Sequence, residues 1–292
     1  MFDNAYPKPN VAPLRQYAQQ HYPTLTRRRA VDCHKGQLGT VGVLGGSEGM
    51  TGAALLASVA ALYAGCGKVI AAFNQTTLPI SVYTSQPELI LNTAERAVLR
   101  EDISTWVIGC GLGQDEAAAR VLHTVWHSAH PQLVLDADAI HLLVEQPKLF
   151  PQTKRADLVL TPHPGEAAHL LNTGINQIQN NRSWAAREIA SRYRCWVVLK
   201  GYETVISSVR GFLHVNKTGN SGLASAGSGD VLAGIIGSLL AQGIVAEEAV
   251  PAAVWLHGMA AELLVHTQHG PIGLTASELP TTVRWLRNQL TI

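Results

Sequence analysis

The sequence predicts an α/β domain of three layers, in which a mostly parallel central sheet lies between two layers of helices. Three observations predict this class. From Gly39 onward, short β-branched runs alternate with amphipathic or alanine-rich stretches. Runs such as Trp196–Leu199 are apolar at every position, which is typical of parallel strands that are buried on both faces. No linker or internal repeat interrupts residues 34–292, so we expect one domain behind an N-terminal extension of residues 1–33.

The expected elements follow one another along the chain. The extension is polar and rich in proline, and we expect one short helix in it, over residues 14–20. Short runs of β-branched or aromatic residues predict strands over residues 40–44, 68–73, 106–108, 133–135, 157–160 and 196–199. Alanine-rich or amphipathic stretches predict helices over residues 53–64, 116–128, 182–193 and 231–242. Two strand-like runs around a short polar turn, 203–207 and 211–215, predict an antiparallel hairpin at a sheet edge.

The charge balance argues against a nucleic-acid partner. The 292 residues include 22 Lys and Arg against 21 Asp and Glu, a formal net charge of +1. The basic run Arg27–Arg29 is interpreted as solvated surface, because sequence-independent nucleic-acid affinity needs clustered cations. Charged residues make up 15% of the chain, against about a quarter in a typical domain. This low share favours a homo-oligomer, in which neighbouring subunits cover part of the surface.

Cysteine spacing and apolar segments predict a cytoplasmic protein. The four cysteines lie far apart without a C-x-x-C pair, which fits neither a disulfide framework nor a zinc knuckle and favours a reducing compartment. The longest helix-like apolar stretch is expected at Ala53–Ala64, about twelve residues against the roughly twenty that cross a bilayer. Pro7, Pro9 and Pro13 stand where a secretion signal needs an apolar run. We therefore expect no membrane segment, no export signal and no protein-bound zinc.

The most informative motif is the glycine-rich turn Gly227–Asp230, which precedes the expected apolar helix over residues 231–242. Its small residues allow the backbone amides of Gly227, Ser228 and Gly229 to point towards one anion, and a helix start adds partial positive charge. The same dipole would hold Asp230 ionised, so that its carboxylate accepts a proton from a substrate hydroxyl. Alternatively, Asp230 only caps the helix, and the turn alone leaves both interpretations open.

Two further glycine-rich turns stand at expected strand ends. Gly45–Gly52 lacks both the ending of a P-loop and the spacing of a dinucleotide fingerprint. Gly109–Gly113 follows the strand expected over 106–108. Such glycines either permit close packing of strand on helix or bring backbone close to a bulky ligand, here near Ala53 and Ala54. Because ligands of parallel sheets collect at the carboxyl ends of the strands, ligand contact is favoured.

Charged residues follow three other expected strands. Thr161–Glu166 presents His163 in a loop stiffened by two prolines, where ligand contact competes with a purely structural role. Lys200 opens the segment Lys200–Thr204 and is either a point charge for a phosphate or a surface lysine. Asp136 and Asp138 follow the strand over 133–135, and they either hold a metal or a ribose hydroxyl or form a turn.

Nine short motifs occur in a fixed order along residues 34–285. They are His34–Thr40, Gly45–Ser47, Gly52–Ala54, Gly111–Gly113, Asp136–Ala139, Thr161–Glu166, Leu199–Gly201, Thr218–Asn220 and Gly227–Asp230. In this order they resemble the motifs of the ADP-dependent NAD(P)H-hydrate dehydratase family. The resemblance implies a ribokinase-like fold and a repair reaction, in which the S form of hydrated NADH or NADPH is dehydrated while ADP becomes AMP and phosphate.

The resemblance also implies roles for individual residues. Asp230 would be the base that activates the substrate hydroxyl, with Gly227, Ser228 and Gly229 as the anion hole. ADP is the implied phosphoryl donor, with Mg²⁺ to neutralise charge. Nucleotide contacts would come from Lys200, Gly201, Tyr202, Glu203, Thr204 and Gly229. Substrate contacts would come from Ala53, Ala54, Gly111, Gly113, His163 and Asp230.

Relatives in this family often carry an N-terminal epimerase domain, and the 33 residues before the first motif are too few for one, so we expect epimerase activity to come from another protein. The family resemblance also favours a tetramer. Lys217 stands where many relatives have proline. The rival hypothesis is a small-molecule kinase of the same ribokinase-like group, of the vitamin-precursor type, which would stop at a phosphorylated product. A second rival is a non-catalytic dinucleotide-binding protein.

Overall fold

The computed structural model describes residues 10–128, 132–151, 158–267 and 270–292. Within these residues the chain forms one nine-stranded sheet with the strand order β3-β2-β1-β4-β5-β6-β7-β8-β9. Pairing is parallel from β3 to β7, whereas β8 and β9 are antiparallel to their neighbours. The strands are β1 (Thr40–Gly45), β2 (Lys68–Phe73), β3 (Ile90–Thr93), β4 (Thr105–Ile108), β5 (Gln132–Leu135), β6 (Leu158–Leu160), β7 (Trp196–Leu199), β8 (Val205–Ser208) and β9 (Leu213–Val215).

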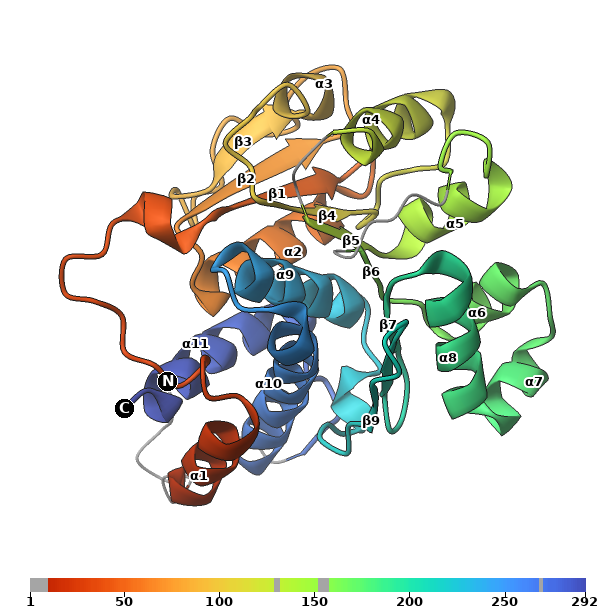
Figure 1. Cartoon of the computed structure of the whole chain (residues 1–292). Coiled ribbons are helices and arrows are strands. Elements are labelled where there is room, and N and C mark those ends of the chain that lie inside the picture. Colours follow the sequence, from red (N-terminus) through yellow and green to blue (C-terminus); the bar gives the residue numbers. More distant parts are fainter. Residues whose placement is uncertain (1–9, 129–131, 152–157, 268–269) are drawn as a thin grey trace.

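Helices cover both faces of this sheet, as Figure 1 shows. Alternate residues of each strand point to opposite faces, so Val107 and Val134 join one core while Ile108 and Leu135 join the other. The first core is covered by α2 (Thr51–Ala64), α9 (Ser228–Ala241), α10 (Ala246–Thr267) and α11 (Leu279–Leu290). The second is covered by α3 (Ala94–Ala97), α4 (Glu116–Trp126), α5 (Ala137–Glu145), α6 (Pro164–Leu171), α7 (Ile175–Asn180) and α8 (Arg182–Tyr193). The predicted three-layer α/β architecture is confirmed.

Most of the predicted elements are present. The strand over 68–73, the helix over 182–193 and the strand over 196–199 match the observed bounds, and the edge hairpin is β8 and β9. Of the strand predicted over 157–160, the structure shows Leu158–Leu160, and Asp157 lies outside the described residues. The short strand β3 was not predicted. Helix α9 begins at Ser228, three residues earlier than predicted, so the glycine-rich motif forms its first turn.

The prediction that Ala53–Ala64 is the longest apolar helical stretch is wrong. Helix α10 has 22 residues, and its most apolar window has a mean hydropathy of 1.2, enough by length and composition alone to cross a membrane. However, 83% of that window is buried inside the protein, and α10 packs on α9 and α11. Periodicity failed here because a helix enclosed on nearly all sides has no polar face to mark its period. We interpret α10 as a core helix.

The described part of the N-terminal segment packs against the last helices of the chain. Helix α1 (Ala12–His21) places the Tyr17 ring in a stack on Trp255 of α10, with ring centroids 5.4 Å apart. Arg15 Nε donates to the Gln289 carbonyl at 2.9 Å, and the Ile292 N–H donates to the Thr26 carbonyl at 3.1 Å. Residues 12–26 therefore contribute to the α10–α11 side of the first core.

Candidate active site

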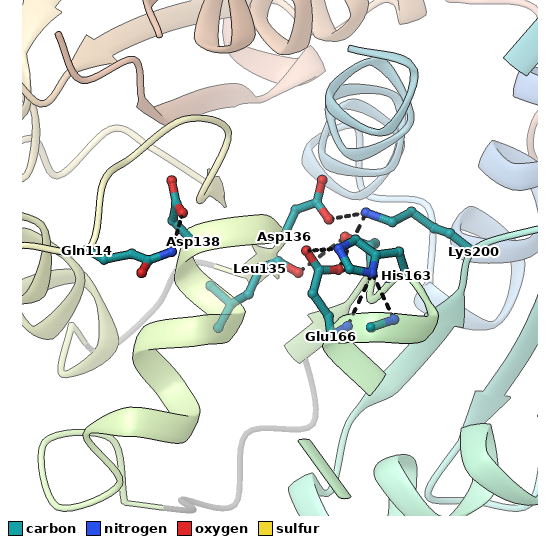
Figure 2. A network of polar contacts seen from close by, with 9 residues as sticks. Gln114, Leu135, Asp136, Asp138, His163, Glu166 and Lys200 are labelled. Atoms are coloured by element: carbon teal, nitrogen blue, oxygen red, sulfur yellow. Dashed lines mark hydrogen bonds and ion pairs between the residues drawn. The ribbon is translucent and has the colours of Figure 1, made fainter. Parts of the chain in front are cut away.

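A buried ion pair joins the carboxyl ends of β5 and β7. Asp136 directly follows β5, Lys200 directly follows β7, and Asp136 Oδ1 lies 2.5 Å from Lys200 Nζ (Figure 2). The side chains are 3% and 19% exposed, respectively. Glu166 of α6 adds a second carboxylate, with Oε2 3.9 Å from the same ammonium. Strands β5, β6 and β7 are parallel neighbours, so groups that follow them meet at one edge of the sheet.

His163 acts as the cap of helix α6. Its Nδ1 accepts hydrogen bonds from the Gly165 N–H at 2.9 Å and the Glu166 N–H at 3.2 Å. Glu166 Oε2 in return accepts from the His163 N–H at 2.7 Å, which completes a capping box. His163 Nε2 lies 3.3 Å from Glu166 Oε1, and the side chain remains 56% exposed. The predicted substrate-contact residue thus has a structural role, and its ring is also open to a ligand.

Burial and charge act against each other in this cluster. Burial alone lowers the pKa of the Lys200 ammonium, but Asp136 and Glu166 outweigh burial and raise that pKa. Burial also raises the pKa of Glu166, and the negative charge of Asp136 adds to the rise while Lys200 opposes it. Lys200 therefore stays protonated at neutral pH.

Asp230 lies beside this ion pair, in the first turn of α9. The nearest donor atoms of Cys110, Asp136 and Asp230 all lie within 4.8 Å of one another. Burial and then the negative charge of Asp136 raise the pKa of Asp230 to about 6, whereas the Cys110 thiol and Lys200 lower it. The Cys110 thiol is fully buried, and burial keeps its pKa well above the usual value, so it is a neutral hydrogen-bond donor. Asp230 consequently combines ionisation near neutral pH with a raised basicity.

The start of α9 differs in detail from the predicted anion hole. The cap position is Gly227, no side chain caps the helix, and the alternative that Asp230 is only a cap is therefore wrong. Gly227 has φ +86°, and a Cβ there would lie 2.4 Å from Leu56 Cδ1. The Ser228 N–H donates to the Ser225 carbonyl at 3.3 Å. The amides of Gly227, Gly229 and Asp230 have no hydrogen-bond acceptor in the described part of the chain and are left to bind an anion.

A cavity of about 660 Å³ opens beside the start of α9. All five residues of the predicted nucleotide segment Lys200–Thr204 line it, and so do Ser228 and Gly229. A Cβ at Gly229 would lie 3.3 Å from Lys200 Nζ and 3.6 Å from Asp136 Oδ2, so the missing side chain leaves the ion pair open. Lining residues not predicted as site residues are Asn216, Lys217, Thr218, Gly219, Asn220, Ser221, Leu223, Ala224, Ser225, Leu232, Val254, His257 and Gly258.

Helix α10 holds one wall of this cavity in place. Thr218 Oγ1 donates to the Trp255 carbonyl at 3.3 Å, and the Gly219 N–H donates to Glu262 Oε1 at 2.9 Å. A Cβ at Gly258 would lie 2.2 Å from Thr218 Oγ1 and 2.6 Å from the Thr218 carbonyl carbon. The loop that contains Thr218 therefore sits directly on the backbone of α10.

We expect Gly258→Ala to lower the free energy of unfolding by about 1–3 kcal/mol, because the new methyl group overlaps backbone that has little room to move. The loop at Thr218 must also shift. Urea denaturation measures the loss of stability. Gly52→Ala is the matched stability control, since a Cβ at this position in α2 meets nothing within 4 Å. Equal stability of the two variants would contradict the packing argument.

Four of the six predicted substrate residues, Ala53, Ala54, Gly111 and Gly113, belong to the turns and helix start that follow β1 and β4. The Ser47 N–H donates to the Gly111 carbonyl at 2.7 Å, which joins the two glycine-rich turns. A Cβ at Gly111 would lie 3.3 Å from the Ala53 Cβ. Ala54 is fully buried, so its side chain packs inside the protein against the turn and does not face the surface.

Asp136 and Asp138 do not act as a pair. Asp138 Oδ2 accepts from the Gly113 N–H at 2.9 Å, and Oδ1 accepts from the Gln114 amide at 2.9 Å (Figure 2). Asp138 therefore anchors the turn that carries Gly113, and only Asp136 reaches the ion-pair cluster. Of the two alternatives, ligand binding and turn formation, Asp138 shows the second, and ligand binding by Asp136 stays a prediction.

Among the residues that the structure describes, Cys110, Asp136 and Asp230 are the one group of three possible metal ligands within 4.8 Å. A protonated thiol is a poor ligand for Mg²⁺, which prefers oxygen. Asp136 Oδ2 fits better, because it is a carboxylate oxygen that faces Gly229 while Oδ1 binds Lys200. One histidine pair was not predicted from the sequence: His123 on α4 and His127 at the C-cap of that helix have ring centroids 4.4 Å apart.

Comparison with known proteins decides the family. The family model described as NAD(P)H-hydrate dehydratase matches residues 41–284. The chain belongs to the NAD(P)H-hydrate dehydratase family. It is 48% identical over 275 residues to the ADP-dependent (S)-NAD(P)H-hydrate dehydratase of Neisseria meningitidis, and the match covers 92% of each chain. The resemblance predicted from the nine ordered motifs is thereby confirmed.

Two solved structures share the fold. The ADP/ATP-dependent NAD(P)H-hydrate dehydratase of Bacillus subtilis, co-crystallised with ATP and Mg²⁺, has a TM-score of 0.80 at 31% identity, over 94% of this chain and 97% of that one. A ribokinase-like superfamily protein of Enterococcus faecalis also has a TM-score of 0.80, at 27% identity, over 91% and 92% of the two chains. The predicted ribokinase-like fold of this dehydratase family member is confirmed.

Proposed function

We propose that this chain is an ADP-dependent (S)-NAD(P)H-hydrate dehydratase, which restores NADH or NADPH from the S form of the hydrate and converts ADP into AMP and phosphate. The family membership and the Neisseria relative support this activity. The observation that carries it is the position of Asp230, a partly buried carboxylate with a raised pKa, next to the free amides of α9 and the Asp136–Lys200 pair. A base, anion-binding amides and a cation are the groups that phosphoryl transfer to a hydroxyl needs.

The reaction has two steps in this site. Asp230 accepts the proton of the substrate hydroxyl, whose oxygen bonds to the terminal phosphorus of ADP while the bond from that phosphorus to the bridging oxygen breaks and AMP leaves. The bond from the ring carbon to the phosphate oxygen then breaks and phosphate leaves, a proton passes from the adjacent ring carbon to water, and the double bond of the reduced nicotinamide re-forms between the two carbons. Hydroxide is a poor leaving group and phosphate a good one, so phosphorylation makes the dehydration easy.

The other predicted residues keep their proposed roles. We assign nucleotide binding to the Lys200–Thr204 segment and Gly229, which line the cavity. We assign substrate binding to the joined turns, with contacts from Ala53, Gly111 and Gly113 and packing support from the fully buried Ala54, and to the exposed ring of His163. The ammonium of Lys200 neutralises Asp136 and adds positive charge beside the anion-binding amides. Mg²⁺, which supplies charge neutralisation when it is bound with ADP, would be held by phosphate oxygens and Asp136 Oδ2.

The assay that tests this proposal supplies hydrated NADH and ADP to the purified protein. We expect recovery of the near-ultraviolet absorbance of reduced nicotinamide, with one phosphate released per NADH. The rival function, a small-molecule kinase, requires that a phosphorylated small molecule accumulates. If such a product forms and the hydrate is not consumed, the dehydratase proposal is wrong. Parallel reactions with ATP in place of ADP determine the preferred donor.

The raised pKa of Asp230 predicts the pH dependence of the reaction. Only the ionised carboxylate accepts a proton, so kcat/KM should be constant above the pKa and fall about tenfold per pH unit well below 6. Initial rates between pH 5 and 9 at subsaturating hydrate measure this limb. A carboxylate of ordinary pKa would leave kcat/KM flat down to about pH 4, and that profile would remove Asp230 from the role of base.

We also propose that residues 34–292 form the catalytic domain behind the extension of residues 1–33. The enzyme is proposed to be a cytoplasmic homo-oligomer, with a tetramer as the favoured state. The low share of charged residues, 15%, supports subunits that cover part of the surface. Light scattering of the full chain measures the subunit number, and a monomer at micromolar concentration would contradict this proposal.

A further inference from the structure

A buried histidine of α10 contacts the start of α9. His257 lies in the middle of α10 and is 6% exposed, and Ser228, the first residue of α9, is also 6% exposed. Ser228 Oγ and His257 Nε2 are 3.3 Å apart. Both residues line the cavity proposed for the nucleotide.

The imidazole of His257 is neutral at physiological pH. Burial lowers its pKa to about 4, and the positive charge of Lys200 adds to this effect, while a hydrogen bond to the Ser228 backbone opposes it. A neutral imidazole carries one ring proton. His257 therefore cannot bind a phosphate as a cation, and it can act on Ser228 as a hydrogen-bond donor or as an acceptor.

An anion at the start of α9 selects between these two arrangements. If His257 Nε2–H donates to Ser228 Oγ, the hydroxyl proton is free to point at the anion and adds a donor to the amides of Gly229 and Asp230. If Nε2 instead accepts the hydroxyl proton, Ser228 presents only lone pairs to the anion, which is repulsive. In the first arrangement the hydroxyl replaces the Ser228 N–H as a donor to the anion, because that N–H already donates to the Ser225 carbonyl.

We propose that His257 is a positioning residue that holds the Ser228 hydroxyl with its proton directed at the transferred phosphoryl group. This assignment rests on the proposed function. The hydroxyl donor gains strength as negative charge develops on that group, in a cavity wall that is shielded from water. His257 acts through Ser228 and does not itself touch the nucleotide.

The test combines single and double variants with kcat and KM for ADP. We expect Ser228→Ala to lower kcat about a hundredfold, as for the loss of one donor to a developing oxyanion. His257→Leu should lower kcat roughly tenfold to a hundredfold, and the double variant should be no slower than the slower single variant. His257→Gln retains an N–H donor and should recover most of the loss. The matched control is His266→Leu, at an exposed position near the end of α10.

Three results would overturn the assignment: wild-type kcat in His257→Leu, penalties that multiply in the double variant, or a folded His257→Gln that is as slow as His257→Leu. If His257→Leu does not fold, the same cycle is run with His257→Gln and Ser228→Ala.

Nucleotide affinities test the role of His257 independently of the proposed reaction. AMP lacks the phosphoryl group that Ser228 is proposed to contact, so both single variants should weaken ADP binding about tenfold and leave AMP binding unchanged in calorimetric titrations. Equal weakening of both nucleotides would reveal a merely structural role. If the wild type does not dehydrate hydrated NADH, the proposed function fails, whereas the ratio of ADP to AMP affinity still tests His257.

Discussion

Asp230→Asn is expected to abolish turnover of hydrated NADH while ADP still binds. The amide cannot accept the hydroxyl proton, and loss of a general base costs about 10²- to 10⁴-fold in rate. The backbone amides of α9 that would bind phosphate are unchanged by the substitution. Single-turnover rates and calorimetric ADP affinities, measured on the same preparations, separate the two effects.

Unfolding cannot explain this loss. Asp230 has a pKa near 6 in the folded protein, above the ordinary value of about 3.9, so its ionisation opposes folding as pH rises through that range. At pH 8 the neutral Asn variant should be at least as stable as the wild type. Asp32→Asn, at an exposed aspartate, is the control for loss of one acidic group. A turnover rate in Asp230→Asn within threefold of wild type would refute the role of base.

Lys200→Met is expected to be the most destabilising single substitution at the site. It leaves the Asp136 carboxylate, 3% exposed, without its cation, and breaking one side of a buried pair costs about 3–5 kcal/mol. The double variant Lys200→Met/Asp136→Asn removes both charges and should regain most of that free energy of unfolding. ADP affinity should be low in both variants, because the cation beside the phosphate site is missing.

The chain contains a matched control for this prediction. Lys68 and Asp102 form a pair at the same 2.5 Å distance, but their side chains are 25% and 40% exposed. An exposed pair contributes at most about 1 kcal/mol, so Lys68→Met should change the free energy of unfolding only slightly. Urea denaturation of all the variants measures these free energies of unfolding. A Lys200→Met variant as stable as Lys68→Met would show that burial does not strengthen the dependence of Asp136 on Lys200.

Local sequence patterns predicted the sheet well, and they predicted the helices less well. Strands such as Trp196–Leu199 are marked by continuous β-branched and aromatic residues, and the bounds of that strand were predicted correctly. Helix α10 was missed because its residues are apolar on nearly all sides, so no period is visible. The short strand β3 (Ile90–Thr93) carries polar residues at a sheet edge, and a four-residue segment of that kind gives no clear pattern.

The sequence allowed us to predict those site residues that follow a strand or belong to one of the ordered motifs. Lys200 and Asp136 were both identified, but nothing in the sequence shows that these two residues, which are 64 positions apart, form an ion pair. Asp138 looked equivalent to Asp136, and only the fold turns it towards Gly113. His257 gave no signal beyond a histidine inside an apolar run, because its meaning depends on α10 crossing the start of α9.

The central claim is that the first turn of α9 binds the phosphoryl group that Asp230 helps to transfer. A crystal structure of this chain with ADP and Mg²⁺ tests it most directly. We predict the terminal phosphate of ADP within hydrogen-bond distance of the Gly229 and Asp230 amides, with the rest of the nucleotide in the cavity lined by Lys200–Thr204. A well-ordered nucleotide whose phosphates lie away from this turn would contradict the account.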